Sequence, residues 1–163
     1  MQVKKKLLTL LAGAAVSLST SVFAQTLTYG APITLDAAKK IAAAAATEAK
    51  KQNLTVVISI VDSSGTLTYL EKIDGTQLAS VDVAIGKART ANNFKRPTKV
   101  FEDGVAGGRY VLLSLPEGTL LIEGGSPIVV DNKIIGAIGV SGATSQQDGQ
   151  IAEAGLASLK KTK

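Results

Sequence analysis

The sequence contains no cysteine, no histidine and no tryptophan, and its single methionine is Met1. Without cysteine no disulfide can stabilise the fold, so stability must come from a hydrophobic core, which a chain of this length can build as one domain. Zinc sites of the histidine and cysteine type, Ser-His-Asp triads and Cys-His dyads are excluded as well. We therefore expect no zinc, no other metal site and no catalytic residues of the familiar hydrolase kinds.

Residues 1–24 are typical of a cleavable bacterial signal peptide. Three lysines at positions 4–6 precede an apolar run of about ten residues, and Val22-Phe23-Ala24 forms a small-x-Ala cleavage signal. A membrane-spanning helix needs about 20 apolar residues, so an uncleaved anchor or an N-terminal core helix is the less favoured alternative. We predict cleavage after Ala24, a single mature domain of residues 25–163, and a periplasmic or extracellular location.

Cleavage also changes the charge of the protein. The full chain has 18 Lys and Arg against 13 Asp and Glu, and losing the three N-terminal lysines lowers its formal net charge from +5 to +2. Aromatic residues make up only 4% of the chain. We therefore expect no nucleic-acid binding, which relies on basic surfaces and aromatic stacking, and no membrane insertion once the signal peptide is removed.

Hydrophobic periodicity and turn residues predict short, clearly separated elements in the order α-β-β-α-(loop)-β-β-β-α. Helices are expected after Thr34 as N-cap up to Asn53, from a Ser80 cap to about Phe94, and after a Ser145 cap supported by Asp148. Residues 99–108 should form a short helical turn and loop, and residues 109–115 fit either a strand or a second turn. Strands are predicted at 54–61, 66–73, 118–123, 127–130 and 133–141.

The second predicted helix carries a surplus stripe besides its core face. Val83, Lys87, Thr90 and Phe94 line up at helical spacing on that stripe. A subunit contact or the wall of a ligand site explains it, and so does simple solvent exposure with an extended Lys87 side chain.

Glycines 136, 139 and 142 do not form a dinucleotide-binding fingerprint, which needs a different spacing between a strand and a helix. Within an apolar strand, Gly136 and Gly139 favour close packing of another backbone, with close approach of a ligand as the alternative. The adjacent acids Glu102 and Asp103 are expected on a solvated surface.

Five motifs, in this order along the chain, resemble the GlcG/HbpS family: Asp62-Ser-Ser-Gly65, Ile73-Asp-Gly75, Lys87-Ala-Arg-Thr-Ala91, Gly124-Gly-Ser-Pro-Ile128 and Ile135-Gly-Ala-Ile-Gly-Val-Ser-Gly142. The resemblance implies a profilin-like α+β fold, with a five-stranded antiparallel sheet flanked by helices. It also implies homo-oligomers and, for exported members, binding of haem or a related tetrapyrrole. The sequence departs from the family in having Lys72 where Arg is frequent, and in lacking the histidine that some relatives use as an iron ligand.

These observations favour an exported homo-oligomer that binds haem weakly, with Lys87, Arg89, Thr90, Arg109 and Tyr110 as candidate ligand-binding residues. Two alternatives stay open. One is a protein that binds a ligand other than a tetrapyrrole. The other is an enzyme acting on a small metabolite, with Lys87, Arg89 and either Asp74 or Glu123 polarising the substrate.

Haem iron is generally held by His, Met, Cys or Tyr, so only tyrosines remain as strong ligands in the mature chain. Tyr29 is expected in the N-terminal leader and Tyr69 within a strand. Tyr110 is the best placed of the three, because its neighbour Arg109 can pair with a haem propionate. An ordinary half-buried role for Tyr110 is the simpler alternative.

Overall fold

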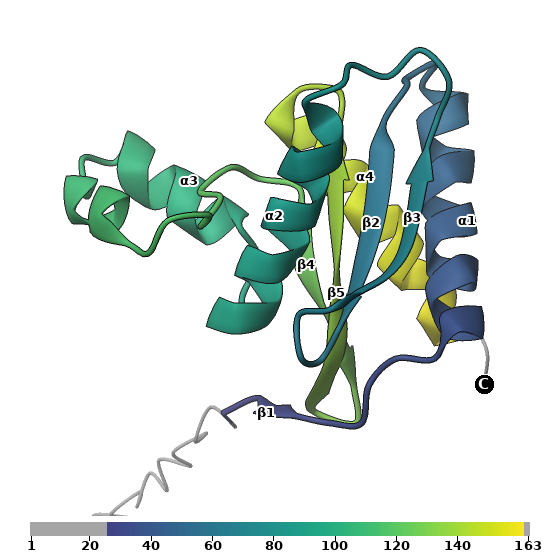
Figure 1. The fold of residues 1–163 in the computed structure, drawn as a ribbon, viewed down its shortest axis with the longest axis horizontal. Helices are drawn as coiled ribbons and strands as arrows, with labels where there is room; N and C mark the ends of the chain where they lie inside the picture. The colour runs from purple at the N-terminus through teal and green to yellow at the C-terminus, as the bar shows by residue number, and fades with distance from the viewer. Residues whose placement is uncertain (1–25, 162–163) are drawn as a thin grey trace, which may run out of the picture.

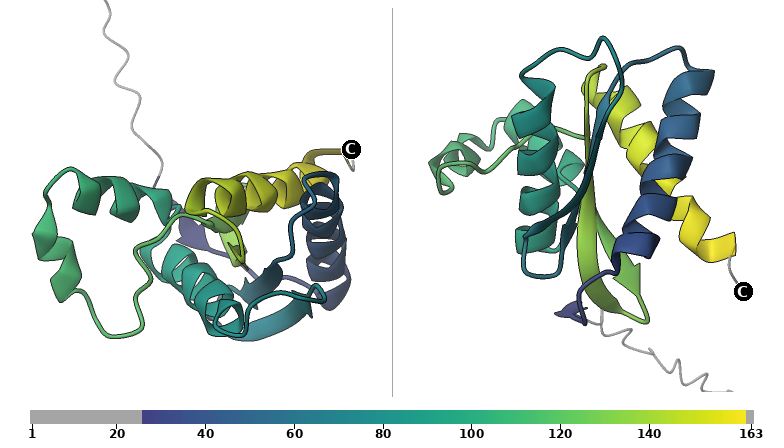
Figure 2. Two further views of the ribbon diagram at one scale, coloured as in Figure 1. Left: turned by 90° about the horizontal axis from the view of Figure 1, so that it is seen from above. Right: turned by 45° about the vertical axis from the view of Figure 1, so that its right-hand side comes forward.

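The computed structural model describes residues 26–161, and the predicted signal peptide at residues 1–24 lies outside them. The described chain forms three layers: one helix covers one face of a central sheet, and two helices cover the other (Figures 1 and 2). Among the described residues, none of the helices has the length and apolar character needed to cross a bilayer.

The sheet has five strands, and the long strand β5 lies at its centre. Gly139 of β5 is in register with Ser59 of β2 and with Gly125 of β4, so β2 and β4 flank β5 on opposite edges, both antiparallel to it. β3 pairs with the outer edge of β2, while β1 runs parallel to the start of β5. The strands are β1 (Thr28–Tyr29), β2 (Val57–Asp62), β3 (Leu67–Lys72), β4 (Gly125–Val130) and β5 (Lys133–Ser141).

The predicted count of five strands is right, but one member differs. Residues 118–123 do not form a strand, and the fifth strand is instead β1, within the segment expected to be a leader. Because β1 is parallel to β5, the sheet is mixed rather than wholly antiparallel. The two turns at Asp62-Ser-Ser-Gly65 and Asp131-Asn132 are confirmed, the second by positive φ angles of 47° and 60°.

The helices follow their predicted ranges, with corrections at two caps. Thr34 caps the first helix as predicted, its hydroxyl accepting a hydrogen bond from the Ala37 amide. Ser80 is the first helical residue rather than a cap, and Thr144, not Ser145, caps the last helix in a reciprocal pair with Gln147. The helical segments are α1 (Leu35–Lys51), α2 (Ser80–Phe94), α3 (Lys99–Ala106), the 3₁₀ turn η1 (Tyr110–Ser114), α4 (Ser145–Ala157) and the 3₁₀ turn η2 (Ser158–Lys161).

Alternation along the strands divides the core into two halves. Ile58, Ile60 and Ile138 point to the face covered by α1 and α4, where the alanines of α1 let the helix lie close to the sheet. Val61 and Ala137 point to the other face and pack against α2.

Gly139 lies on the α2 side of the sheet, and a Cβ added there would overlap the Ala84 carbonyl oxygen. Close packing, one of the two predicted explanations for this glycine, is therefore the correct one.

Residues 99–123 form an arm that leaves the three-layer body and returns to it (Figures 1 and 2). It contains α3 and η1, which settles the open prediction for residues 109–115 as a turn. Glu102 holds the base of the arm, because its carboxylate accepts hydrogen bonds from the Ser145 hydroxyl (2.8 Å) and the Glu123 amide. Lys99 forms ion pairs with Asp103 at 2.8 Å and Glu123 at 3.6 Å. The expectation that Glu102 lies on a solvated surface is therefore wrong.

Candidate ligand-binding site

A groove of about 710 Å³ lies between α2 and the returning part of the arm, residues 116–120. We call it the α2 groove. Its volume is in the range of about 300–1,000 Å³ that is usual for small-molecule sites. Its walls combine apolar and polar residues: Ile85, Gly86, Phe94, Pro116, Gly118 and Leu120, with Asp82, Arg89, Thr90, Asn93, Glu117 and Thr119.

Two residues of α2 hold the opposite wall of the groove in place. The Leu120 amide donates a hydrogen bond of 2.8 Å to the hydroxyl of Thr90, a residue that is only 3% exposed. One turn earlier, a Cβ added to Gly86 would lie 2.8 Å from Leu120 Cγ, so the glycine makes room for this leucine. Thr90, a predicted site residue, thus positions the wall of the groove as well as lining it.

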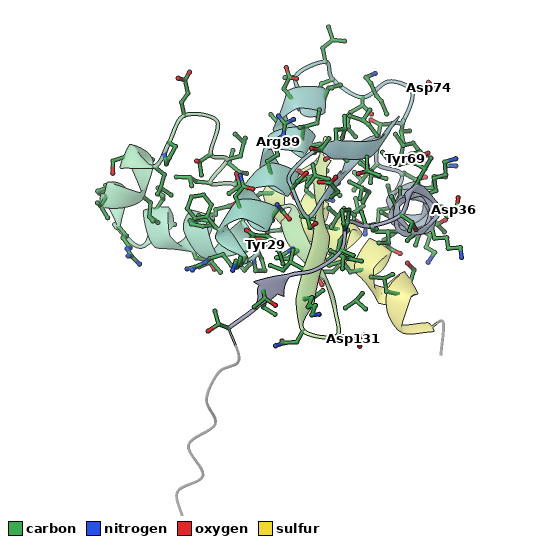
Figure 3. The ribbon with its side chains drawn as sticks, turned by 60° about the horizontal axis from the view of Figure 1, so that its bottom comes forward. Tyr29, Asp36, Tyr69, Asp74, Arg89 and Asp131 are labelled. Atoms are coloured by element: carbon green, nitrogen blue, oxygen red, sulfur yellow. The ribbon has the colours of Figure 1, made fainter. Side chains whose placement is uncertain are left out.

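Arg89 is the cation of the groove, and it projects from α2 on an exposed face (Figure 3). Its Nε donates to the Gly65 carbonyl oxygen at 3.2 Å, which ties it to the turn between β2 and β3. No carboxylate among residues 26–161 forms an ion pair with Arg89. The guanidinium is therefore oriented by the protein and available to an anionic group of a ligand.

Asp62 stabilises the turn on which Arg89 rests. Its carboxylate accepts hydrogen bonds from the backbone amides of Ser64 (2.8 Å) and Thr66 (3.0 Å). Partial burial raises the pKa of Asp62, but the hydrogen bonds from Ser64 and Thr66 outweigh it and hold that pKa below its ordinary value.

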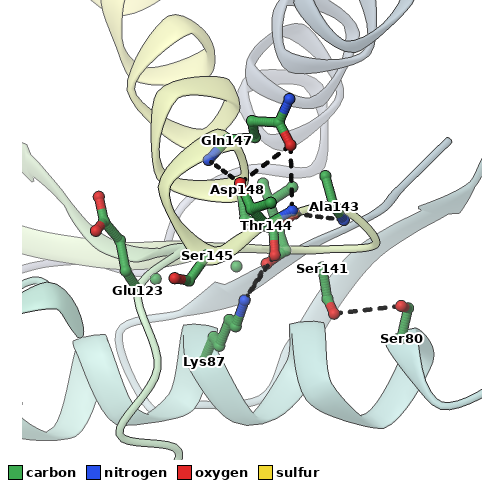
Figure 4. Close-up of polar contacts among 12 residues, drawn as sticks. Ser80, Lys87, Glu123, Ser141, Ala143, Thr144, Ser145, Gln147 and Asp148 are labelled. Atoms are coloured by element: carbon green, nitrogen blue, oxygen red, sulfur yellow. Dashed lines mark hydrogen bonds and ion pairs between the residues drawn. The ribbon is translucent and has the colours of Figure 1, made fainter. Parts of the chain in front are cut away.

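Lys87, another predicted site residue, does not line the groove. Its side chain is 2% exposed, and its Nζ donates to the Val140 carbonyl oxygen at 3.0 Å and to Asp148 Oδ2 at 2.8 Å (Figure 4). Of the alternatives left open for the stripe, solvent exposure of Lys87 is therefore wrong. The ion pair joins α2, on one face of the sheet, to the first turn of α4 on the other.

Asp148 is the group that sequence reasoning missed, since it was expected only as a capping acid. Burial raises the pKa of Asp148, although Lys87 and the Ala143 amide, which donates to Oδ1 at 3.1 Å, act in the opposite direction. Gly124 closes over the pair with φ of +126°, and a Cβ added there would lie 2.8 Å from Lys87 Nζ. The sequence held one signal for this pair: Lys87 stands between apolar residues on a helix stripe, and a lysine buried there needs a carboxylate as its partner.

The remaining residues of the surplus α2 stripe are largely covered by the chain itself. The Phe94 ring packs edge-on against Phe101 of α3, with ring centres 5.2 Å apart, and also lines the groove. Val83 is half-buried. Two residues of the stripe, Thr90 and Phe94, therefore form part of one wall of the groove, and Phe94 also supports the arm.

Arg109 and Tyr110 lie at the far end of the arm and are not part of the α2 groove lining. Tyr110 is 67% exposed, so the prediction of a half-buried aromatic residue is wrong. The structure thus brings Arg89 and Thr90 together in one groove, while Lys87 is buried in an ion pair and Arg109 and Tyr110 lie on a separate surface.

The other two tyrosines have structural partners. The Tyr29 hydroxyl donates to the Asn92 carbonyl oxygen at 2.9 Å, and Lys95 Nζ lies 4.7 Å above its ring. The Tyr69 hydroxyl donates to Glu71 at 3.2 Å, and burial together with the charge of Glu71 raises the pKa of Tyr69. Neither residue lines the α2 groove.

The residues of the enzyme alternative are not joined into one site. Asp74 is exposed in the turn after β3, and Glu123 pairs with Lys99. Within the described part of the chain, no hydrogen bond or ion pair links either acid to Lys87 or Arg89. The same part of the chain has no group of three or more Asp or Glu residues arranged to hold a metal ion.

Comparison with known proteins identifies the family. A family model described as "Haem degrading protein HbpS-like" matches residues 33–157. The chain belongs to the HbpS-like family. The predicted resemblance to GlcG and HbpS is thereby confirmed. Protein GlcG of Escherichia coli K12 is 44% identical over 104 residues, which cover 64% of this chain and 77% of GlcG.

Solved structures of HbpS-like proteins share the fold. A double mutant of Streptomyces reticuli HbpS is 33% identical, with a TM-score of 0.72, and the match covers 91% of this chain and 99% of HbpS. A structure described as a PduOC–haem complex is 29% identical, with a TM-score of 0.70, and the match covers 78% of this chain and 94% of PduOC. The predicted α+β class is confirmed.

Proposed function

We propose that this protein binds haem or a related tetrapyrrole in the α2 groove, and that it works outside the cytoplasm as a homo-oligomer. The observation that carries the proposal is the combination, in one groove, of apolar walls with an oriented and unpaired arginine. A porphyrin has apolar faces and carboxylate side groups, so the walls suit the ring and Arg89 suits a propionate.

The groove fits the porphyrin better than it fits the iron. None of the residues that line it is a His, Met, Cys or Tyr, and these are the usual iron ligands. The ammonium group of Lys87 donates to Asp148 and to the Val140 carbonyl oxygen, and this residue does not line the groove. Within one chain, apolar contact and propionate pairing therefore supply the affinity, which predicts modest binding and a weakly ligated, high-spin spectrum.

Relatives support the same ligand class. The matching family is described by haem degradation, and the related PduOC structure is a complex with haem. The signal peptide predicted at residues 1–24 supports export, which would place the protein where extracellular haem occurs.

The ligand proposal is tested by titrating the mature protein with haemin and following the Soret band. Arg89→Gln removes the cation but keeps a polar side chain of similar length, and we expect about tenfold weaker binding, the effect of one charge-assisted hydrogen bond. Arg96→Gln is the matched control, because Arg96 is an exposed arginine outside the groove. Equal affinity of wild type and Arg89→Gln would contradict the proposed site.

Export and assembly have separate tests. Intact-mass analysis of exported protein should show an N-terminus at Gln25 or within a residue or two, and a mass that retains residues 1–24 would contradict export by cleavage. Light scattering should show at least two subunits, and a monomer at tens of micromolar would contradict the homo-oligomer.

A further inference from the structure

At the far end of the arm, three large apolar or aromatic side chains are exposed to solvent and not packed into the core. We define the arm tip as residues 107–114. Tyr110, Val111 and Leu113 are 67%, 66% and 65% exposed, respectively. Arg109 is the only charged residue between positions 104 and 116. Within the described chain, no hydrogen bond engages the Tyr110 hydroxyl. An apolar cluster with one cation at its edge is typical of a contact surface.

The α2 groove has the complementary character. Ile85 and Leu120 give it apolar surface, and Asp82 and Glu117 provide two carboxylates for a cation such as Arg109. It also lacks an iron ligand, which is what an exposed tyrosine can supply.

The arm tip is held away from the groove of its own chain. Leu112 packs back on α3, since a Cβ added to Gly104 would lie 2.7 Å from Leu112 Cδ1. Hydrogen bonds of Glu102 fix the base of the arm, and its returning part forms one wall of the groove. The arm bends out from α2 in the view from above (Figure 2).

We infer that the arm tip of one copy docks across the opening of the α2 groove of a second copy, where Arg109 faces Asp82 or Glu117 and Tyr110 reaches the neighbour's ligand site from its open side. Each copy offers one arm tip and one groove. Two copies related by a two-fold axis can therefore form two identical contacts, with every tip and every groove occupied. The charge match with the groove favours a second copy over a lipid surface as the partner. The role of Tyr110 as an iron ligand rests on the proposed function, whereas the docking itself does not.

The docking is tested without haem, using the absence of native cysteine. Val111→Cys places a thiol on the tip and Asn93→Cys places one in the groove, and the two variants are mixed under mild oxidation. We expect the mixed disulfide dimer to form about tenfold faster than when Lys40→Cys, on the exposed side of α1, replaces Asn93→Cys. Equal rates, a predominance of Val111→Cys homodimers, or a monomer that binds anionic phospholipid vesicles through the tip would overturn the docking.

Charge reversal gives a second measurement of the same contact. Arg109→Glu should weaken dimerisation in light scattering, and adding Glu117→Arg or Asp82→Arg to it should restore part of the loss. If neither second change restores any, the assigned charge contact is wrong.

The ligand role of Tyr110 has its own readout. Tyr110→Phe removes only the hydroxyl, so cross-linking should stay unchanged while the haemin spectrum loses its phenolate-to-iron band. Arg109→Ala should also weaken haemin binding. An unchanged spectrum overturns the shared site but leaves haem binding by the groove intact. If wild type binds no haemin, the proposed function and the role of Tyr110 fail together, and the cross-linking rate still decides the docking.

Discussion

The three-layer body buries a pair of charged side chains, whereas the arm exposes apolar ones. In the body a lysine and an aspartate are almost completely buried, at 2% exposure each, and they satisfy one another. In the arm, aliphatic and aromatic residues are about two-thirds exposed, as at Val111 and Leu113. Burial of a charge and exposure of a large apolar group both cost free energy unless a partner compensates them.

The compensating partner differs between the two regions. Lys87 finds its partner 61 residues along the same chain, so the body is complete by itself. The apolar tip of the arm finds none among the described residues, so its partner is expected outside the chain. Changes in the body should therefore alter folding stability, and changes in the arm should alter association.

The largest effect is expected from Lys87→Met. This variant leaves Asp148 as an uncompensated buried carboxylate, and removing one member of a buried pair costs about 3–5 kcal/mol. Urea unfolding at neutral pH measures the loss. Lys99→Met is the control, because Lys99 pairs on the exposed surface of the arm, and its unfolding midpoint should stay close to that of wild type.

The same variant has a defined pH dependence. Burial raises the pKa of Asp148, and without the ammonium of Lys87 that pKa rises further. A carboxyl whose pKa is higher in the folded than in the unfolded state stabilises the fold most below its unfolded pKa of about 3.9, and this contribution is lost as pH rises through the folded-state pKa. The cost of Lys87→Met should therefore be smaller at about pH 5 than at about pH 7.5. A cost that is larger at the lower pH would contradict the assignment.

The next largest effect is expected from Gly139→Ala. The added methyl group meets backbone atoms of α2, which cannot turn aside as a side chain can. We expect a loss of about 3 kcal/mol in free energy of unfolding, at the upper end of overpacking effects. Gly107→Ala is the matched control in the arm, where φ is −79° and the residue is exposed. A loss of equal size in both variants would show that the arm is as tightly packed as the body.

A smaller effect is expected at the start of α4. Thr144→Ala removes the hydroxyl that accepts a hydrogen bond from the Gln147 amide, and such a cap contributes about 1 kcal/mol. Thr47→Ala, on the exposed side of α1, is the control. Thermal unfolding of the two variants compares them directly, and an equal change would mean that the Thr144 cap adds nothing.

The smallest effect on folding is expected from Leu113→Ser in the arm tip. This side chain is 65% exposed, so the free energy of unfolding at a concentration where the protein is monomeric should change by less than about 0.5 kcal/mol. Sedimentation at higher concentration should nevertheless show weaker association. Strong destabilisation of the monomer would erase the contrast between the two regions.

Local sequence patterns determined most of the body. The bounds of β5 at 133–141 and the end of α2 at Phe94 were predicted correctly, because apolar periodicity and turn residues act within a few positions along the chain. The motifs also identified the family, and two of the predicted site residues, Arg89 and Thr90, line the same groove.

Only the tertiary structure decided how distant segments meet. Residues 118–123 have the composition of a strand, yet Leu120 packs on Gly86 and bonds to Thr90, so this segment forms a groove wall instead. The pairing of Lys87 with Asp148, the parallel β1 strand and the separation of Tyr110 from Arg89 all depend on contacts between residues far apart in sequence. Local periodicity carries no information about such contacts, since it reports which face of an element is buried and not what buries it.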